Sequence, residues 1–334
     1  MHIINTFILS ILILYLIYIF SKKFHLFIEN PSNSIRKIHN SDVVKIGGVS
    51  MLSFYLSLFY VNEPLLIEII MFGSAFMLIG LFADLNPNIS GKVRFYIMVV
   101  LLIFFIWKNN FLINNYDHVI LDQILNINYI KYLFVLMGLM FSINGFNFID
   151  GNNGLMTGVA LIILFNFLIY IDSSNIEAYV FVQILTAGII SLFLINFFTG
   201  KIISGDCGAY FIGFIIGTLS IYISNNSIIY STLIACIICY PINELFISFW
   251  RRLLFNKKNP LKPDDKHMHS VLYKIICYYF EKYNFNTSNI FFNPNSSTSM
   301  IILSFLIFSS IFIYLYGNDI GYLNTFFIIS FFQL

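Results

Sequence analysis

Long apolar runs separated by short polar loops constrain the fold of this chain more than any other feature. Runs of about 17–25 apolar residues can cross a bilayer as helices, because a helix satisfies its own backbone hydrogen bonds in lipid. The composition agrees, since 59% of the residues are hydrophobic and 10% are charged, whereas soluble domains carry about 25% charge. Candidate spans lie near residues 3–20, 47–61, 65–83, 95–107, 129–145, 155–171, 178–197, 208–223, 228–249, 300–316 and 320–334. We therefore predict an all-α, polytopic membrane protein of about 10 or 11 transmembrane helices.

The basic residues indicate how these helices are oriented. Lys and Arg are retained on the cytoplasmic side of a membrane. With the N-terminus outside, the alternating loops leave only Lys108 and Lys131, of 18 Lys and Arg residues, on the outer side. We expect the C-terminus inside if there are eleven spans, and residues 251–299 then form a long cytoplasmic loop. The membrane lipid is the expected surroundings of the chain, and no nucleic-acid partner is expected.

Three of the predicted inside loops each place one acid where a span meets the cytoplasm. These are Asp84 in "FADLNPNISGKVRF", Asp150 in "NGFNFIDGNNGLMTG" and Asp206 in "GKIISGDCGAYFIG". For any one loop, helix capping and turn formation by Asp, Asn and Gly explain the pattern equally well. The acids predicted outside share no such pattern, and we interpret them as solvated loop charges: Glu63, Glu68, Asp117, Asp122, Asp172, Glu177 and Asp319.

Taken together, the three inside acids indicate a site for a divalent cation and phosphates. Ionisable groups at membrane depth are costly and are usually functional. Mg²⁺ prefers a few carboxylates together with phosphate and water oxygens. Glycines at 151, 154, 205 and 208 would let backbone N–H groups approach an anion at a helix start.

The loop at 251–299 adds a histidine pair. It opens with "FWRRLLFNKKNPLKPDDKHMHSVL", and a basic cluster beside a span is commonly explained by attraction to anionic lipid. His267 and His269 follow a Pro-Asp element. Their imidazoles could hold a diphosphate or donate protons, although structural hydrogen bonding explains an isolated HxH equally well.

These motifs together resemble those of the polyprenyl-phosphate N-acetylhexosamine-1-phosphate transferases. The run "NGFNFIDGNNGLMTG" is similar to the family signature NxxNxxDGxDGLaxG. In the family's order, "RKIHNSDVVKIGG" resembles the early motif that ends in GG, "GLFADLNPNISGKVRF" the GxxDDxxxLsxxxKxR element, "NFFTGKIISGDCGAYFIG" the GKxFxGDxGA element, and "PDDKHMHSVL" the PDRxHxHH element. The resemblance extends from about residue 29 to 275, so it implies that residues 1–334 are one integral membrane transferase domain.

The resemblance implies a reaction in which a polyprenyl phosphate attacks a UDP-sugar, giving polyprenyl-diphospho-sugar and UMP. Mg²⁺ or Mn²⁺ is the implied cofactor, and the setting is the bacterial inner membrane with the active site facing the cytoplasm. The product would start a lipid-linked envelope glycan, and the family includes homodimers. The matching positions give Asp206 as the metal ligand, Asp84, Asp150, His267 and His269 as further catalytic residues, and Asn147, Asn153, Lys92, Arg36 and Lys37 as substrate-binding residues.

Departures from the family pattern leave two hypotheses. Ala83 stands at the first Asp of the DD pair, and Asn153 at the second Asp of DGxDG. Further departures are Asp265, Ser270 and Glu244. The first hypothesis is an active transferase that has diverged, with Asn153 altering the contacts to nucleotide or sugar. The second is an inactive relative that binds polyprenyl phosphate or scaffolds glycan assembly. A secondary transporter would show intramembrane acids and two repeated halves, and neither is evident.

Overall fold

The computed structural model describes residues 1–29, 42–86, 88–117, 119–172, 174–226, 230–254, 267–285, 293–317, 319 and 321–323. Helices dominate these residues. The elements are α1 (His2–Phe24), β1 (Ile28–Glu29), β2 (Val43–Val44), the 3₁₀ helix η1 (Gly47–Phe59), α2 (Pro64–Leu85), α3 (Gly91–Asn109), α4 (Val119–Leu125), α5 (Asn128–Ile149), α6 (Leu155–Tyr170), α7 (Ile176–Thr199), α8 (Gly205–Asn226), α9 (Ser231–Ile237), α10 (Cys239–Leu254), α11 (Met268–Lys282) and α12 (Pro294–Tyr316).

The prediction of an all-α polytopic membrane protein is confirmed. Among the described residues, six helices are long and apolar enough to cross a membrane, or up to seven if the bent pair α9 and α10 is one span. Two of the predicted runs form shorter apolar helices, η1 and α6. The run at 320–334 lies almost entirely outside the described residues. The total of about 10 or 11 spans therefore stays a prediction.

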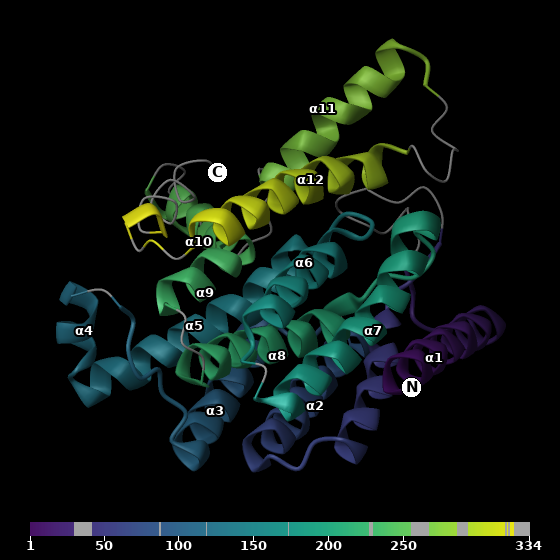
Figure 1. Ribbon diagram of the computed structural model, residues 1–334. Coiled ribbons are helices and arrows are strands. Elements are labelled where there is room, and N and C mark those ends of the chain that lie inside the picture. Colours follow the sequence, from purple (N-terminus) through teal and green to yellow (C-terminus); the bar gives the residue numbers. More distant parts are fainter. Residues whose placement is uncertain are drawn as a thin grey trace.

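Helix α8 lies in the middle of the bundle, between α2, α5 and η1 (Figure 1). In its most apolar stretch of 18 residues, 89% of the residues are buried, so this helix is surrounded by other helices rather than by lipid. Helix α1 lies at one edge of the bundle and α12 at the other (Figure 1). In the most apolar 18-residue stretches of α1 and α12, only 17% and 28% of the residues are buried. Such low burial is consistent with a position facing the lipid.

Glycines let the neighbouring backbones approach α8 closely. A Cβ added to Gly48 of η1 would lie 2.2 Å from the Cα of Gly208, and one added to Gly80 of α2 would lie 2.3 Å from the carbonyl oxygen of Asp206. Small residues serve this purpose in membrane helix packing, because little hydrophobic force drives helices together in lipid. Both contacts fall on the first turn of α8, so packing fixes the position of that turn.

A short extended segment also holds the entry to α8. Strands β1 and β2 pair antiparallel, and Val44 forms a parallel bridge with Ile202. Just beyond β2, the N–H groups of Gly47 and Gly48 donate to the carbonyls of Ile203 and Ser204 at 2.9 and 3.0 Å. The "KIGG" part of the early motif is thereby bound to the residues that precede Asp206.

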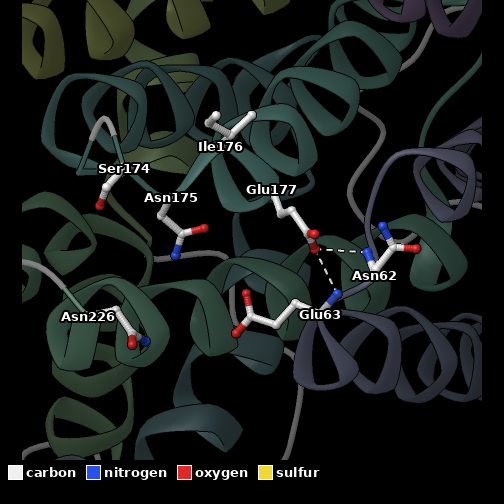
Figure 2. Close-up of a pocket in the computed structure, with 7 residues that line it drawn as sticks. All are labelled: Asn62, Glu63, Ser174, Asn175, Ile176, Glu177 and Asn226. Carbon is white, nitrogen blue, oxygen red and sulfur yellow. Dashed lines mark hydrogen bonds between the residues drawn. The ribbon is translucent and has the colours of Figure 1, made fainter.

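At the opposite end of α2, acids that we interpreted as solvated loop charges have structural partners. Glu177 Oε2 accepts from the backbone N–H groups of Asn62 and Glu63 at 2.8 and 2.7 Å (Figure 2). Glu63 in turn accepts from the Tyr222 hydroxyl at 2.6 Å. Both carboxylates line an open cavity of about 620 Å³. Both residues are half-exposed, but their interpretation as solvated charges did not include the hydrogen bonds that they accept.

Candidate functional site

The three acids from separate inside loops meet at one end of the bundle. Asp84 belongs to the last turn of α2, Asp150 follows the last residue of α5, and Asp206 belongs to the first turn of α8. Burial raises the pKa of Asp150 to about 8, and the nearby charges of Asp206 and Asp84 add to that rise. The three carboxylates therefore form one electrostatic cluster.

Asp84 caps the start of α8. Its Oδ1 accepts from the backbone N–H of Asp206 at 3.2 Å, and its Oδ2 accepts from that of Cys207 at 3.0 Å. Both oxygens are thus engaged by α8, whose first backbone N–H groups have no partner within the helix. For this residue the capping explanation holds. Asp84 acts on the site by fixing the turn that carries Asp206.

Asp206 forms an ion pair with Arg94 of α3. The guanidinium Nη1 of Arg94 contacts Asp206 Oδ2 and also donates to the Tyr210 hydroxyl at 3.1 Å. The Asn147 side chain lies beside the same carboxylate. The side chains of Asp206 and Arg94 are each 25% exposed, so the pair can be reached from outside the protein.

The roles of Arg94 and Lys45 were not predicted from the sequence, where both residues served only to orient the helices. Lys45 lies close enough for its charge to act on both Asp84 and Asp206, and its Nζ is 3.0 Å from Glu29 Oε2. Lys92, the basic residue selected from the motif, is exposed. Helical geometry could have distinguished Lys92 from Arg94, because residues two positions apart point to different faces of a helix. Arg36 and Lys37 lie outside the described residues.

The histidine pair contacts the motif that carries Asp150. His267 occupies the position before the first residue of α11, and His269 belongs to the first turn of that helix; both are buried. The ring of Phe148, two residues before Asp150, has its centroid 4.1 Å from that of His267 and 6.4 Å from that of His269. The HxH motif and the "FIDGNN" motif are therefore in contact.

The surroundings of the two histidines are polar on the side of α10. His267 Nδ1 lies 3.3 Å from Ser248 Oγ, and His269 Nδ1 lies 3.6 Å from Glu244 Oε1. Ser270, which replaces a family histidine, is also buried, and Asp265 lies outside the described residues. Glu244, a departure from the family pattern, thus belongs to the histidine site.

Asn153 lies in the turn between α5 and α6 and is buried. Its backbone N–H donates to Asn295 Oδ1 at 2.8 Å, and the N–H of Gly154 donates to Asn196 Oδ1. The structure therefore brings Asn147, Asp150 and Asn153 to the same end as Asp84 and Asp206. Lys92 lies at the same end, in the first turn of α3, but it is exposed.

The donor atoms suit a cation that takes few protein ligands. Within the described ranges, no group of three or more His, Cys, Asp or Glu side chains is arranged to hold a metal ion. Mg²⁺ typically takes one or two carboxylates and completes its shell with phosphate and water. Asp206 and Asp150 could supply such carboxylates, whereas both oxygens of Asp84 are engaged. Burial is the main cause of the raised pKa of Asp150, and the charges of Asp206 and Asp84 add to it; a cation bound beside these acids would favour their charged forms.

Comparison with known proteins gives a consistent result. The sequence pattern of glycosyl transferase family 4 matches residues 66–224. The chain is 27% identical over 253 residues to an undecaprenyl-phosphate alpha-N-acetylglucosaminyl 1-phosphate transferase of Thermotoga maritima, covering 76% of this chain and 75% of the relative. It is 24% identical over 249 residues to a probable undecaprenyl-phosphate N-acetylglucosaminyl 1-phosphate transferase of Bacillus subtilis, covering 72% and 68%. A shorter match, 37% over 78 residues, is to a phospho-N-acetylmuramoyl-pentapeptide-transferase of Dictyoglomus turgidum, covering 23% and 25%.

Proposed function

The chain is a divergent member of glycosyl transferase family 4, and from this we propose that it transfers a sugar 1-phosphate from a UDP-sugar to a polyprenyl phosphate, such as undecaprenyl phosphate. The observation that carries the proposal is the meeting of Asp84, Asp150 and Asp206 around the first turn of α8. All three acids lie within the matched region, residues 66–224.

In the proposed reaction, an oxygen of the polyprenyl phosphate forms a bond to the sugar-linked phosphorus. The bond from that phosphorus to the bridging oxygen breaks, and UMP leaves with the electron pair. Phosphoryl transfer of this kind asks a protein mainly for positioning and charge neutralisation. Arg94 and Lys45 offer positive charge beside the acids, and His267 and His269 are proposed to contact the diphosphate.

We propose Mg²⁺, or Mn²⁺, as the cofactor, held by Asp206 with Asp150. When bound, the cation neutralises charge on the diphosphate. Asp84 keeps the first turn of α8 in place by accepting its N–H groups. Asn147, beside the Asp206 carboxylate, orients that carboxylate.

The acid cluster is proposed to face the cytoplasm of a bacterium, with the chain in the inner membrane. Support comes from Lys45, Lys92 and Arg94, which belong to the loops and helix ends near the cluster and carry the charge expected on the cytoplasmic side. The product is proposed to start a lipid-linked envelope glycan. The panel of UDP-sugars in the assay below identifies the sugar.

A direct assay tests the reaction. Membranes that contain the protein are incubated with undecaprenyl phosphate, Mg²⁺ and a panel of UDP-sugars, and UMP is measured. We expect UMP release with at least one donor, dependent on both the lipid and Mg²⁺. Membranes from cells without the protein provide the baseline. UMP release that does not exceed this baseline with any of the donors would reject the proposal.

A second candidate, a relative without turnover, is favoured by one observation. Ala83 is buried in α2, and the neighbouring Asp84 uses both oxygens on α8, so the DD position offers no uncommitted carboxylate. The variant Ala83→Asp separates the two candidates in the same assay. We expect the wild type to release UMP and Ala83→Asp to change its rate by less than about tenfold. Turnover by Ala83→Asp from an inactive wild type would support the second candidate.

A further inference from the structure

The start of α12 packs on the turn that follows Asp150. Asn295 Oδ1 accepts from the backbone N–H of Asn153 at 2.8 Å, and Ser296 Oγ donates to the carbonyl of Phe197 at 2.9 Å. Asn295 is 6% exposed and Ser296 is fully buried. This part of α12 belongs to the segment at 273–299, which carries no family motif in the sequence, yet it contacts the acid-bearing turn and the end of α7.

Helix α7 holds the same turn from a second direction. Asn196 Oδ1 accepts from the N–H of Gly154, and Asn196 Nδ2 donates to the carbonyl of Ile202 at 2.7 Å. Gly154 has φ +73°, and an added Cβ would lie 2.8 Å from Phe197. Two consecutive backbone N–H groups of the turn are therefore held by side chains from two distant helices.

Three side-chain atoms of Asn152 and Asn153 in the turn are buried without a hydrogen-bond partner. Asn152 is 3% exposed, and neither its Oδ1 nor its Nδ2 has a hydrogen-bond partner; Asn153 Oδ1 also has none. Buried polar atoms are normally paired, and an unpaired one calls for an explanation. A ligand that brings its own hydrogen-bonding groups would satisfy these amides. Side chains of other helices hold the backbone of the turn. The side-chain amides of Asn152 and Asn153 therefore remain available to that ligand.

We propose that Asn295 is a positioning residue that sets the turn for binding of the nucleotide-sugar donor. The inference rests on the proposed function. Amides match the hydroxyl, carbonyl and N–H groups of a nucleotide sugar, whereas a polyprenyl phosphate offers hydrogen-bonding groups only at its phosphate. Asn295 acts through the backbone of Asn153, and a loss of its hydrogen bond should weaken donor binding more than acceptor binding.

The test compares Asn295→Leu, which removes the acceptor oxygen, with Asn295→Asp, which keeps it. Each protein is purified into nanodiscs and assayed with undecaprenyl phosphate and the UDP-sugar that the wild type uses fastest. For Asn295→Leu we expect the donor KM to rise about tenfold, with the acceptor KM within about twofold. For Asn295→Asp we expect a donor KM within about threefold of the wild type. Amide hydrogen exchange of residues 152–155 should accelerate in Asn295→Leu alone.

Thr298→Val is the matched control, because the buried Thr298 hydroxyl bonds only within α12, to the Pro294 carbonyl at 2.7 Å; both KM values should stay unchanged. Asn295→Ala replaces Asn295→Leu if the latter does not accumulate. Equal rises in both KM values, an unchanged donor KM, or no rescue by Asn295→Asp would overturn the inference while the proposed function stands. No UMP release by the wild type overturns the proposed function, and the inference falls with it.

Discussion

Asp206→Asn is expected to lower UMP release by a factor on the order of a thousand or more. The substitution keeps the size of the side chain and removes its charge. Asp206 pairs with Arg94 and lies beside Asn147, so the carboxylate stands at the centre of the proposed site. A neutral amide can neither hold a cation with Asp150 nor compensate Arg94. The measurement is initial UMP release in membranes that contain matched amounts of the two proteins.

Asp172→Asn provides the control for that experiment. Asp172 lies in the loop before α7, where its Oδ1 accepts from the backbone N–H of Ser174 at 2.9 Å. The Asp172→Asn substitution removes one carboxylate from the opposite end of the bundle, and we expect this variant to have activity within about twofold of the wild type. Activity of Asp206→Asn within tenfold of the wild type would contradict the central place that we give to Asp206.

Gly80→Ala is expected to lower the activity of the protein at least tenfold without removing a polar group. The added Cβ would lie 2.3 Å from the carbonyl oxygen of Asp206 and 2.5 Å from the backbone nitrogen of Cys207. Backbone atoms at the start of a packed helix cannot move aside as a flexible side chain can. The first turn of α8 would shift, and overpacking of this kind costs about 1–3 kcal/mol. We expect at least a tenfold loss of UMP release and a lower Tm in detergent.

The matched control is Gly138→Ala in α5, where an added Cβ has no atom within 4 Å. Alanine favours a helix over glycine by about 1 kcal/mol. We therefore expect Gly138→Ala to keep its activity and to have an equal or higher Tm. Similar behaviour of the two alanine variants would show that close approach at Gly80 does not position Asp206.

The helices and the gathering of the acids could be predicted from the sequence. Apolar runs specify spans because the bilayer fixes their length, and the basic residues assign the loops to two sides. Asp84, Asp150 and Asp206 were thus expected at one end, and the structure brings them together. Their division of labour could not be predicted. Capping of α8 by Asp84 depends on a contact with residues 122 and 123 positions away.

The roles of several charged residues could not be predicted for the same reason, because they depend on contacts between segments that are far apart in the sequence. Glu177 looks like a loop acid in the sequence, yet it accepts two N–H groups at the start of α2, which lies next to it only in the folded bundle. Lys92 and Arg94 share one motif, but Arg94 faces Asp206 while Lys92 is exposed. Motifs identify which residues matter together, whereas the rotation of each helix decides which of them touch.

The cap on α8 has a consequence for biosynthesis. At about 5–20 residues per second, roughly ten seconds pass between synthesis of Asp84 and of its partners, which lie 122 and 123 residues further on. During that interval the N-terminal helices hold an acid without its amide partners, and "KIGG" lacks the carbonyls of Ile203 and Ser204 to which it later donates. The acid cluster is therefore completed only when α8 inserts between helices made earlier, so a nascent chain that stops before Gly205 contains the motif of Asp84 but no site.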